Sequence, residues 1–242
     1  MKDFSLQLYS LRDVPELRER LRIAADAGYT GVEFAGYDDI SAADMKDLLS
    51  SLRLRGTGSH ISAEALKSDL EGCIRYCLEA GITSAACPWV DLQTEQDALE
   101  AASFLESCAV KFHEAGIPFA YHNHSHEFAA PNGTYLLEIL MENTKLLGFE
   151  LDVFWAAYAD VDPAAFIQKH AGRFPLLHFK EIGEEKKNVE LGTGRLDFAK
   201  LAALGIAQGT KEIIVEQEDY TMPPADSVKA DAVYMRALSI EN

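Results

Sequence analysis

Four successive apolar stretches in the second half of the chain each end in side chains that can bind a metal or move a proton. Residues two positions apart on a strand face the same side, so these side chains are expected to point to a common place. Spacings of 30, 26 and 38 residues separate the first polar residue of each stretch from the next. The set consists of His122 with His124, Asp152, His178 with Lys180, and Glu216 with Glu218.

Two imidazoles and two carboxylates in this pattern indicate a divalent metal site. A buried carboxylate or imidazole is costly unless it is paired or bound to a metal, and four at equivalent strand ends favour one shared site. We expect the ligands to be His122, Asp152, His178 and Glu216. These donors suit Mn²⁺, Zn²⁺ or Co²⁺, whereas Mg²⁺ is less suited to histidine.

The elements that must position these residues alternate between strands and helices. An Ala-Gly pair closes helical patterns at Gly28, Gly81 and Gly116, where glycine is expected as a left-handed helix cap, and Gly205 is interpreted as a fourth instance. Strands are expected at 4–8, 31–35, 54–60, 83–88, 117–122, 148–153, 175–179 and 212–217, with helices that include 41–52, 134–146, 162–171 and 225–239.

Strands that alternate with helices predict a parallel sheet. Eight such units in 242 residues predict an α/β fold, a single (β/α)8 TIM barrel over residues 1–242. A doubly wound sheet is disfavoured, because no G-x-G-x-x-G follows the first strand. Barrels of this kind place their active sites at the carboxyl ends of the strands, where the polar residues stand.

The composition excludes several classes of protein. Acidic residues outnumber Lys and Arg by 39 to 22, and the net charge of −17 argues against nucleic acid or membranes as partners. We expect no signal peptide. The sequence has no apolar run that could span a membrane, and its four cysteines lack zinc-site or redox-pair spacing. We expect a cytoplasmic protein with reduced thiols, and a homo-oligomer is left open.

Several short motifs along the chain are shared with one family of enzymes. They lie at 6–13 (LQLYSLRD), 31–34 (GVEF), 121–124 (YHNH), 151–155 (LDVFW), 178–181 (HFKE), 192–197 (GTGRLD) and 215–216 (VE). Together they resemble the sugar phosphate isomerase/epimerase family of xylose isomerase-like barrels, in particular its LQLYS branch. The resemblance implies a xylose isomerase-like TIM barrel with a metal at strands five to eight. Asp152, His178 and Glu216 match the family's Asp, His and final Glu.

One position departs from the pattern of that family. Its better-known epimerases have a Glu on strand five, which exchanges a proton with the substrate together with the strand-eight Glu, and here His122 stands at that place. Glu127, five residues later, is the alternative fourth ligand. Strand-five motifs with histidine also resemble inosose-dehydratase-like and keto-glycoside-cleaving members, so a lyase is the alternative to an isomerase or epimerase.

We expect isomerisation or epimerisation of a small polyhydroxy carbonyl compound, such as a sugar or cyclitol. Removing a proton next to the carbonyl creates an enediolate, whose charge a metal stabilises as a Lewis acid. Glu216 is expected to be both ligand and base, with Lys180 or His124 as the proton donor. We expect Lys180 across the substrate from the metal, because a cation beside a divalent metal is disfavoured.

Other strand ends are expected to bind the substrate. Glu33 and His60 end the second and third strands and Glu218 ends the eighth, where each could contact hydroxyl groups. Trp89 and Trp155 offer flat walls for a sugar ring, with core packing as the alternative.

Two further functions are weighed against an isomerase. Endonuclease IV, a DNA-repair enzyme, resembles this barrel, but it needs a three-metal site and a basic groove, which the charge of −17 argues against. The other is a non-catalytic sugar-binding barrel whose site has decayed. The candidate ligands on strands six to eight are intact in the sequence, which argues against decay.

Overall fold

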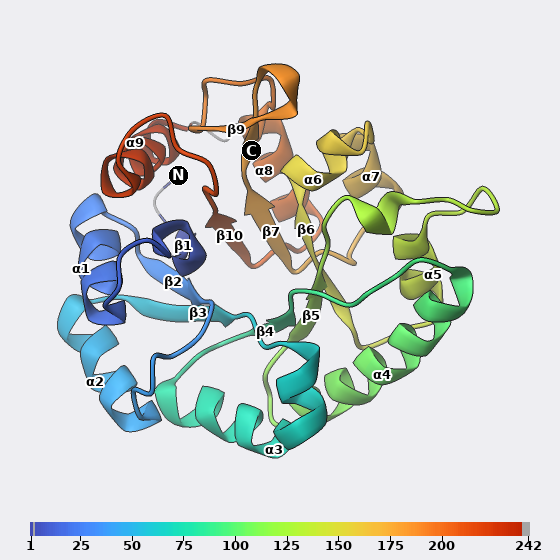
Figure 1. Cartoon of the computed structure of the whole chain (residues 1–242), viewed down its shortest axis with the longest axis horizontal. Coiled ribbons are helices and arrows are strands. Elements are labelled where there is room, and N and C mark those ends of the chain that lie inside the picture. The colour runs from blue at the N-terminus through green and yellow to red at the C-terminus, as the bar shows by residue number, and fades with distance from the viewer. Residues whose placement is uncertain (2, 239–242) are drawn as a thin grey trace.

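Eight parallel strands form a ring at the centre of the molecule (Figure 1). The computed structural model describes residues 1 and 3–238. The strands are β1 (Ser5–Gln7), β2 (Gly31–Phe34), β3 (Arg55–Ser59), β4 (Ala85–Cys87), β5 (Phe119–His122), β6 (Gly148–Asp152), β7 (Leu176–Phe179) and β10 (Glu212–Val215). Each lies within one of the eight stretches predicted from the sequence, and the predicted TIM barrel is confirmed.

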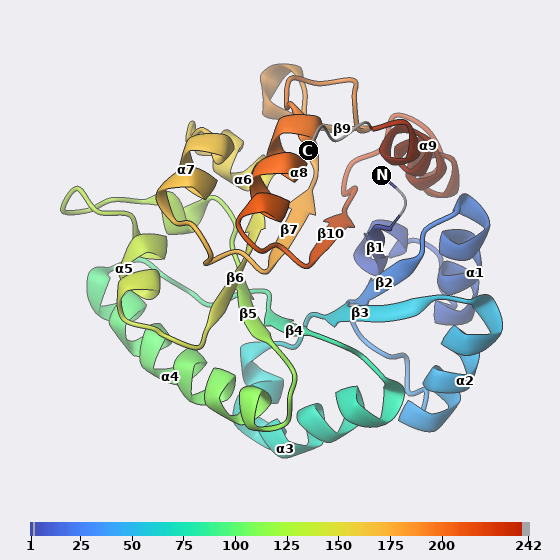
Figure 2. The same ribbon diagram turned by 180° about the vertical axis from the view of Figure 1, so that it is seen from behind.

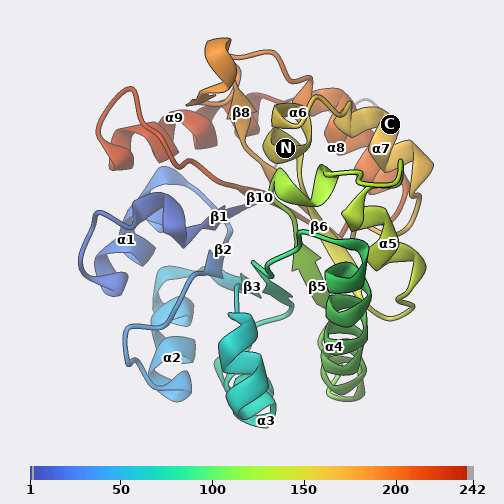
Figure 3. The ribbon, with the colours of Figure 1, turned by 45° about the vertical axis from the view of Figure 1, so that its right-hand side comes forward.

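Helices surround the ring on its outer side (Figures 2 and 3). They are α1 (Leu17–Ala27), α2 (Ala42–Leu52), α3 (Ala63–Ala80), α4 (Glu95–Glu114), α5 (Leu136–Glu142), α6 (Val153–Tyr158), α7 (Pro163–Lys169), α8 (Phe198–Ala207) and α9 (Pro224–Ala237). The chain also forms the short 3-10 helices η1 (Leu8–Leu11), η2 (His126–Phe128) and η3 (Glu184–Lys186). Residue 239 of the predicted helix 225–239 lies outside the described residues. Within the described part of the chain, no helix combines the length and apolarity that crossing a membrane requires.

The ring closes between β3 and β4, the two ends of the strand order β3-β2-β1-β10-β7-β6-β5-β4. At this seam a single parallel bridge joins His60 to Ala86. Ile61 N donates to the Ala86 carbonyl at 2.8 Å, and Ser84 Oγ donates to the Thr57 carbonyl at 2.5 Å. Side-chain hydrogen bonds therefore supplement a short backbone ladder at the point of closure.

Apolar side chains of the described residues pack in three clusters, and two of them build the barrel. The larger core lies between the strands and the helices and includes Leu6, Val32, Leu151, Leu177 and Phe179. The smaller cluster consists of Ala86, Ala120, Leu176 and Ile214. Its last three members stand two positions before His122, His178 and Glu216, so the period of two places them on the same, inward face. The inner cluster is thus the apolar layer on which the polar residues rest.

Three of the four predicted glycine positions follow a helix, and the fourth prediction is wrong. Gly28 and Gly81 are left-handed C-caps of α1 and α3, with φ of 93° and 74°, and Gly116 (φ 79°) follows the C-cap of α4. Gly205 lies inside α8 instead. A Cβ there would come within 2.5 Å of Leu177 Cδ1, so this glycine allows α8 to pack closely against β7.

The connection after β7 contains a small hairpin that the sequence did not predict. Its strands, β8 (Glu181–Ile182) and β9 (Asn188–Val189), pair antiparallel. The buried Glu181 carboxylate accepts hydrogen bonds from the backbone N–H groups of Ile182, Arg195 and Leu196. One buried side chain thereby joins both ends of this long connection.

Replacing Ser84 by alanine is expected to lower the free energy of unfolding by about 1–2 kcal/mol, because a buried hydrogen bond at the seam is lost. Urea unfolding measures the change. The matched control is Ser107→Ala on the exposed face of α4, where Ser107 Oγ donates to the Phe104 carbonyl and the effect should stay within about 0.5 kcal/mol. Equal effects of the two substitutions would contradict a special role for the seam.

Candidate active site and metal centre

A cavity of about 670 Å³ opens at the carboxyl ends of the strands. Of the residues singled out in the sequence, the cavity is lined by His60, Trp89, His122, His124, Trp155, Glu216 and Glu218. Glu33, Asp152, His178 and Lys180 do not line it and are fully buried. The candidate site therefore has two levels, an accessible one and a buried one below it.

The four predicted ligands converge between these levels. His122 from β5, Asp152 from β6, His178 from β7 and Glu216 after β10 each offer one ligand atom, and these atoms all lie within 4.8 Å of one another. Asp152 Oδ2 and His178 Nδ1 are buried without a hydrogen-bond partner. Unpartnered buried polar atoms are costly, and two within one cluster fit a bound cation. The residues present therefore fit the divalent metal that the sequence predicts.

Sequence reasoning missed Glu150, which lies at the centre of the buried level. Its Oε2 is 2.7 Å from His60 Nε2, 3.1 Å from His122 Nδ1 and 3.3 Å from His178 Nε2. Glu150 stands two positions before Asp152 on β6, so the alternation that selected Asp152 also points to it. These four residues form a second cluster with metal-binding geometry, but its nitrogens already contact the carboxylate. The first cluster is the better metal centre.

The structure corrects the predicted role of Glu33. Its carboxylate does not line the cavity, and Gln7 Nε2 donates to Glu33 Oε2 at 2.8 Å. The same oxygen lies 2.7 Å from His178 Nε2. Every residue of β2 is buried. A side chain that points inward from this strand is therefore surrounded by the other strands and not by the cavity. Glu33 positions His178 and does not contact the cavity.

The two buried carboxylates determine which nitrogen of each imidazole is free. A carboxylate only accepts hydrogen bonds, so His178 Nε2 donates to Glu33 and His122 Nδ1 donates to Glu150. In the neutral imidazoles, His178 Nδ1 and His122 Nε2 then carry the lone pairs, and carboxylate–histidine pairs of this kind orient metal ligands. Burial would lower the pKa of His178, but Glu150 and Glu33 raise it well above its ordinary value. A metal at Nδ1 therefore competes with a proton.

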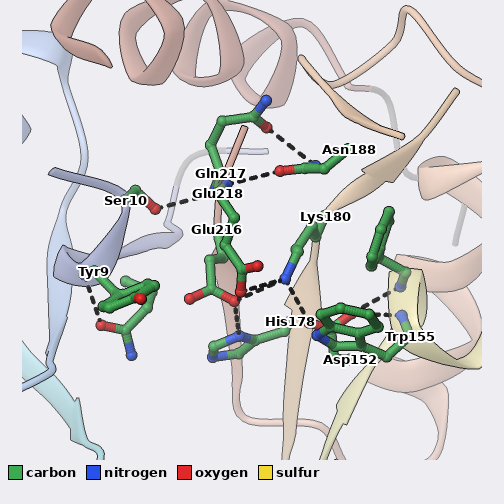
Figure 4. Close-up of polar contacts among 12 residues, drawn as sticks. Tyr9, Ser10, Asp152, Trp155, His178, Lys180, Asn188, Glu216, Gln217 and Glu218 are labelled. Carbon is green, nitrogen blue, oxygen red and sulfur yellow. Dashed lines mark hydrogen bonds and ion pairs between the residues drawn. The ribbon is translucent and has the colours of Figure 1, made fainter. Parts of the chain in front are cut away.

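Lys180 lies among the candidate ligands, which corrects the expectation that it faces them across the substrate (Figure 4). Its Nζ is 3.5 Å from Glu216 Oε2, 3.7 Å from Asp152 Oδ2 and 2.6 Å from Glu218 Oε1. The reason is electrostatic, because buried carboxylates need a cation close by. In this arrangement the ammonium is the neighbour of the ligand cluster.

The carboxylates of Asp152 and Glu216 differ in how well their charges are compensated. Burial raises the pKa of Asp152 to about 7, although Lys180 and His178 act in the opposite direction. For Glu216, burial also acts to raise the pKa, but Lys180 and His178 outweigh it and hold the pKa well below its usual value. Glu216 is therefore ionised at neutral pH. A divalent cation would therefore stabilise the ionised form of Asp152 more than that of Glu216.

His124 stands between two tryptophans at the side of the cavity. The centroid of its ring lies 4.9 Å from that of Trp89 and 5.4 Å from that of Trp155. Burial, assisted by the charges of His122 and Lys180, lowers the pKa of His124 to about 2, so the imidazole is neutral. A neutral imidazole is a weak proton donor, which leaves Lys180 as the stronger candidate for that role. His124 Nδ1 and Trp155 Nε1 have no hydrogen-bond partner among the described residues.

The side chain of Glu127, the alternative fourth ligand, forms its contacts within the segment that follows β5. It is fully buried and accepts hydrogen bonds from Tyr121 Oη at 2.6 Å and from His124 N at 2.9 Å. Its Oε2 also lies 3.2 Å from His126 Nδ1. Glu127 thus holds the turn after β5 and is not part of the ligand cluster, to which the structure brings His122.

His60 and Glu218 line the cavity, as expected for residues that contact a substrate. Each is also tied to the buried level, His60 through Glu150 at 2.7 Å and Glu218 through Lys180 at 2.6 Å. The backbone N–H of Glu218 donates to Asn188 Oδ1 at 2.7 Å (Figure 4). Substrate binding by these two side chains stays a prediction.

Comparisons with known proteins agree with this architecture. A family model described as a xylose isomerase-like TIM barrel matches residues 21–238. No curated protein matches the chain. Among solved structures, a sugar phosphate isomerase/epimerase from Parabacteroides distasonis ATCC 8503 is similar, with 25% sequence identity and a TM-score of 0.83, over 99% of this chain and 96% of that one.

Two other structures are similar in fold at lower sequence identity. An L-ribulose 3-epimerase is 17% identical, with a TM-score of 0.75 over 98% of this chain and 94% of that one. The IolI protein with a bound zinc atom is 11% identical, with a TM-score of 0.79 over 98% of this chain and 97% of that one. The family model covers most of the sequence and confirms the family resemblance seen in the motifs: the chain belongs to the xylose isomerase-like TIM barrel family.

Proposed function

We propose that this protein is a divalent-metal-dependent isomerase or epimerase of a small polyhydroxy carbonyl compound. The observation that carries the proposal is the cluster of His122, Asp152, His178 and Glu216 at the cavity, with Asp152 Oδ2 and His178 Nδ1 unpartnered. The isomerase and epimerase names of similar structures support the reaction class. The zinc of the IolI protein supports a metal in a barrel of this type.

The four residues of the cluster would hold the metal, with Mn²⁺, Zn²⁺ or Co²⁺ the ions best suited to these donors. When bound, the metal supplies a Lewis acid for negative charge that develops on the substrate oxygens. The proton transfers fall to side chains. In an isomerase, one side chain can take a proton from the carbon next to the carbonyl and return it to the former carbonyl carbon, whereas an epimerase needs a second group to return a proton to the opposite face of the same carbon.

Glu216 is the proposed base. Lys180 Nζ at 3.5 Å keeps its carboxylate ionised, and an ionised carboxylate can accept the proton. Its low pKa also favours return of that proton to the rearranged substrate.

Lys180 is the proposed donor to the developing oxyanion. Burial would lower its pKa, but Glu216, Asp152 and Glu218 raise it above the ordinary value, so the ammonium is charged at rest. Its Nζ lies 3.5 Å from Glu216 but does not line the cavity, so donation requires the ammonium to leave Glu218 and turn toward the substrate. His124 Nδ1 and Trp155 Nε1 remain available to orient hydroxyl groups.

The alternatives have weaker support. A probable 3-DHS dehydratase from Bacillus anthracis is similar in structure, but at 15% identity it shows the fold alone, so the lyase is not developed further. The non-catalytic barrel is opposed by a ligand cluster in which every predicted donor is in place.

Mn²⁺ is expected to bind the wild-type chain and to stabilise it by about 2.7 kcal/mol at a free concentration of about 100 times its Kd. Metal analysis and thermal unfolding measure this. Asp152→Asn should lose the gain in Tm, because it removes a carboxylate oxygen from the cluster. The control Asp160→Asn, on the exposed loop after α6, should keep it. A wild-type chain with neither bound metal nor a gain in Tm would favour the non-catalytic barrel.

Glu33→Gln and Glu150→Gln should each weaken Mn²⁺ binding by about 10–100-fold, because the ligand imidazoles lose the carboxylates that orient them. Isothermal titration calorimetry measures the affinity. Glu127→Gln is the matched control, since it changes an equally buried carboxylate outside the cluster and should leave the affinity unchanged. Equal losses in all three variants would indicate general destabilisation instead.

Glu216→Gln should reduce turnover of a free ketose by about 10²–10⁴-fold while the melting curve still shows a folded barrel. Lys180→Met should also lower turnover but should change metal content less, because a protonated ammonium is not a ligand. In D₂O, the wild-type product should carry deuterium at the carbon next to the carbonyl, which mass spectrometry detects. An isomerised product without the label would indicate hydride transfer and would exclude Glu216 as the base.

A further inference from the structure

The cavity at the candidate metal centre has two halves that differ in polarity. One half contains His122, His124, Trp155, Glu216 and Glu218, which are the residues proposed above for catalysis and hydroxyl binding. The other half is lined by residues that follow β2, β3 and β4 and by residues of α3. This apolar half consists of Ala35, Tyr37, Ile61, Ala65, Cys73 and Pro88.

The polar groups in and beside the apolar half are already bonded within the protein. Tyr37 Oη lies 2.6 Å from Ser59 Oγ. Ser62 Oγ, at the edge of this half, accepts a hydrogen bond from Ala65 N at 3.1 Å. Burial raises the pKa of the Cys73 thiol, which keeps it neutral. A sugar hydroxyl placed here would give up its hydrogen bonds to water for few replacements, which is unfavourable.

Two unpartnered polar atoms belong to residues at the other end of the cavity. His124 and Trp155 line the cavity, and His124 Nδ1 and Trp155 Nε1 have no hydrogen-bond partner among the described residues. The metal end of the cavity can therefore form hydrogen bonds with hydroxyl groups of a ligand, and the opposite end can pack against apolar surface of the ligand. Trp89 connects the two, because it lines the cavity and packs against His124 with 4.9 Å between ring centroids.

Apart from the proposed metal, the lining offers no lysine or arginine to an anionic substrate. All residues that line the cavity are described by the structure, none of them is Lys or Arg, and Glu216 and Glu218 add negative charge. Two nearby cations are engaged elsewhere: Lys180 by Glu218 at 2.6 Å, and Arg12 by Tyr220 Oη at 3.0 Å and by the Glu218 carbonyl. Phosphate recognition by side chains relies on Arg and Lys, so the charge of this lining disfavours a phosphorylated compound.

The cavity is large enough for a drug-sized ligand. Its volume of about 670 Å³ falls within the range of about 300–1,000 Å³ that is typical for drug-sized ligands. We propose that the substrate is an uncharged polyhydroxy carbonyl compound with an apolar, ring-sized substituent, and that this substituent sits in the apolar half. The proposal rests on the proposed function for the polar end of the cavity and adds the class of substrate.

Two glucosides that differ only in their substituent test the proposal. The 3-keto derivative of phenyl β-D-glucopyranoside, which carries the carbonyl that the proposed substrate requires, is expected to bind the purified chain with Mn²⁺ about tenfold more tightly than the 3-keto derivative of methyl β-D-glucopyranoside, because burial of the phenyl ring removes apolar surface from water. Isothermal titration calorimetry measures both affinities. Ala65→Phe fills the apolar half from α3 and should abolish the difference. Leu78→Phe adds the same ring at the exposed far end of that helix and should retain it.

Several outcomes would overturn the proposal. Equal affinities for the two glucosides, no measurable binding of the phenyl glucoside, or an undiminished phenyl preference in Ala65→Phe would each exclude the apolar half as a substrate subsite. Glucose 6-phosphate should displace the phenyl glucoside no better than glucose does, and stronger displacement would exclude an uncharged substrate. These are binding measurements, so a phenyl preference without metal-dependent turnover would uphold the subsite and reject the proposed isomerase or epimerase activity.

Discussion

Compensation of buried negative charge is the constraint on which this site depends. Four carboxylates lie inside the barrel with exposures of 4% or less, namely Glu33, Glu150, Asp152 and Glu216. Such groups are unfavourable in a protein interior unless cations or hydrogen-bond donors lie close to them. Around Glu33 and Glu150 the donors are imidazoles, above all His178, and around Asp152 and Glu216 the cation is Lys180. The orientation of the candidate ligands follows from these pairings.

The barrel accommodates these charges by placing small residues on neighbouring strands. A Cβ at Gly58 would lie 2.3 Å from Glu33 Oε1, so a glycine inside β3, normally unfavourable in a strand, provides the space that the carboxylate occupies. Below the charges, Ala86 and Ala120 belong to the inner apolar cluster. An apolar layer beneath the carboxylates keeps the local dielectric constant low, which strengthens every ion pair above it. The small and apolar residues that build the barrel thus also strengthen the interactions among the charged groups at its centre.

Much of this arrangement could be predicted from the sequence, because it is encoded locally. The eight strands follow from short β-like runs between helical patterns, and the period of two along a strand then selects the ligand cluster. Glu150 fits the same period of two, but it stands inside a strand between apolar residues and not at the strand end, where functional residues are expected. The positions of Glu33 and Lys180 could not be predicted, because contacts such as that between Glu33 and His178 join residues 145 positions apart. The β8–β9 hairpin likewise depends on Glu181 reaching backbone groups up to 15 positions away.

The two halves of the cavity come from different parts of the ring. The ligand cluster belongs to β5, β6, β7 and β10, which are adjacent in the strand order, and the apolar half belongs to α3 and to loops after β2, β3 and β4. Residues such as Ala65 and Cys73 take no part in the pairings that compensate the buried charges. Substitutions at these positions can therefore change the shape of the apolar half without changing the charges around Glu216. In this barrel, the proposed proton transfer and the proposed choice of substrate consequently depend on different residues.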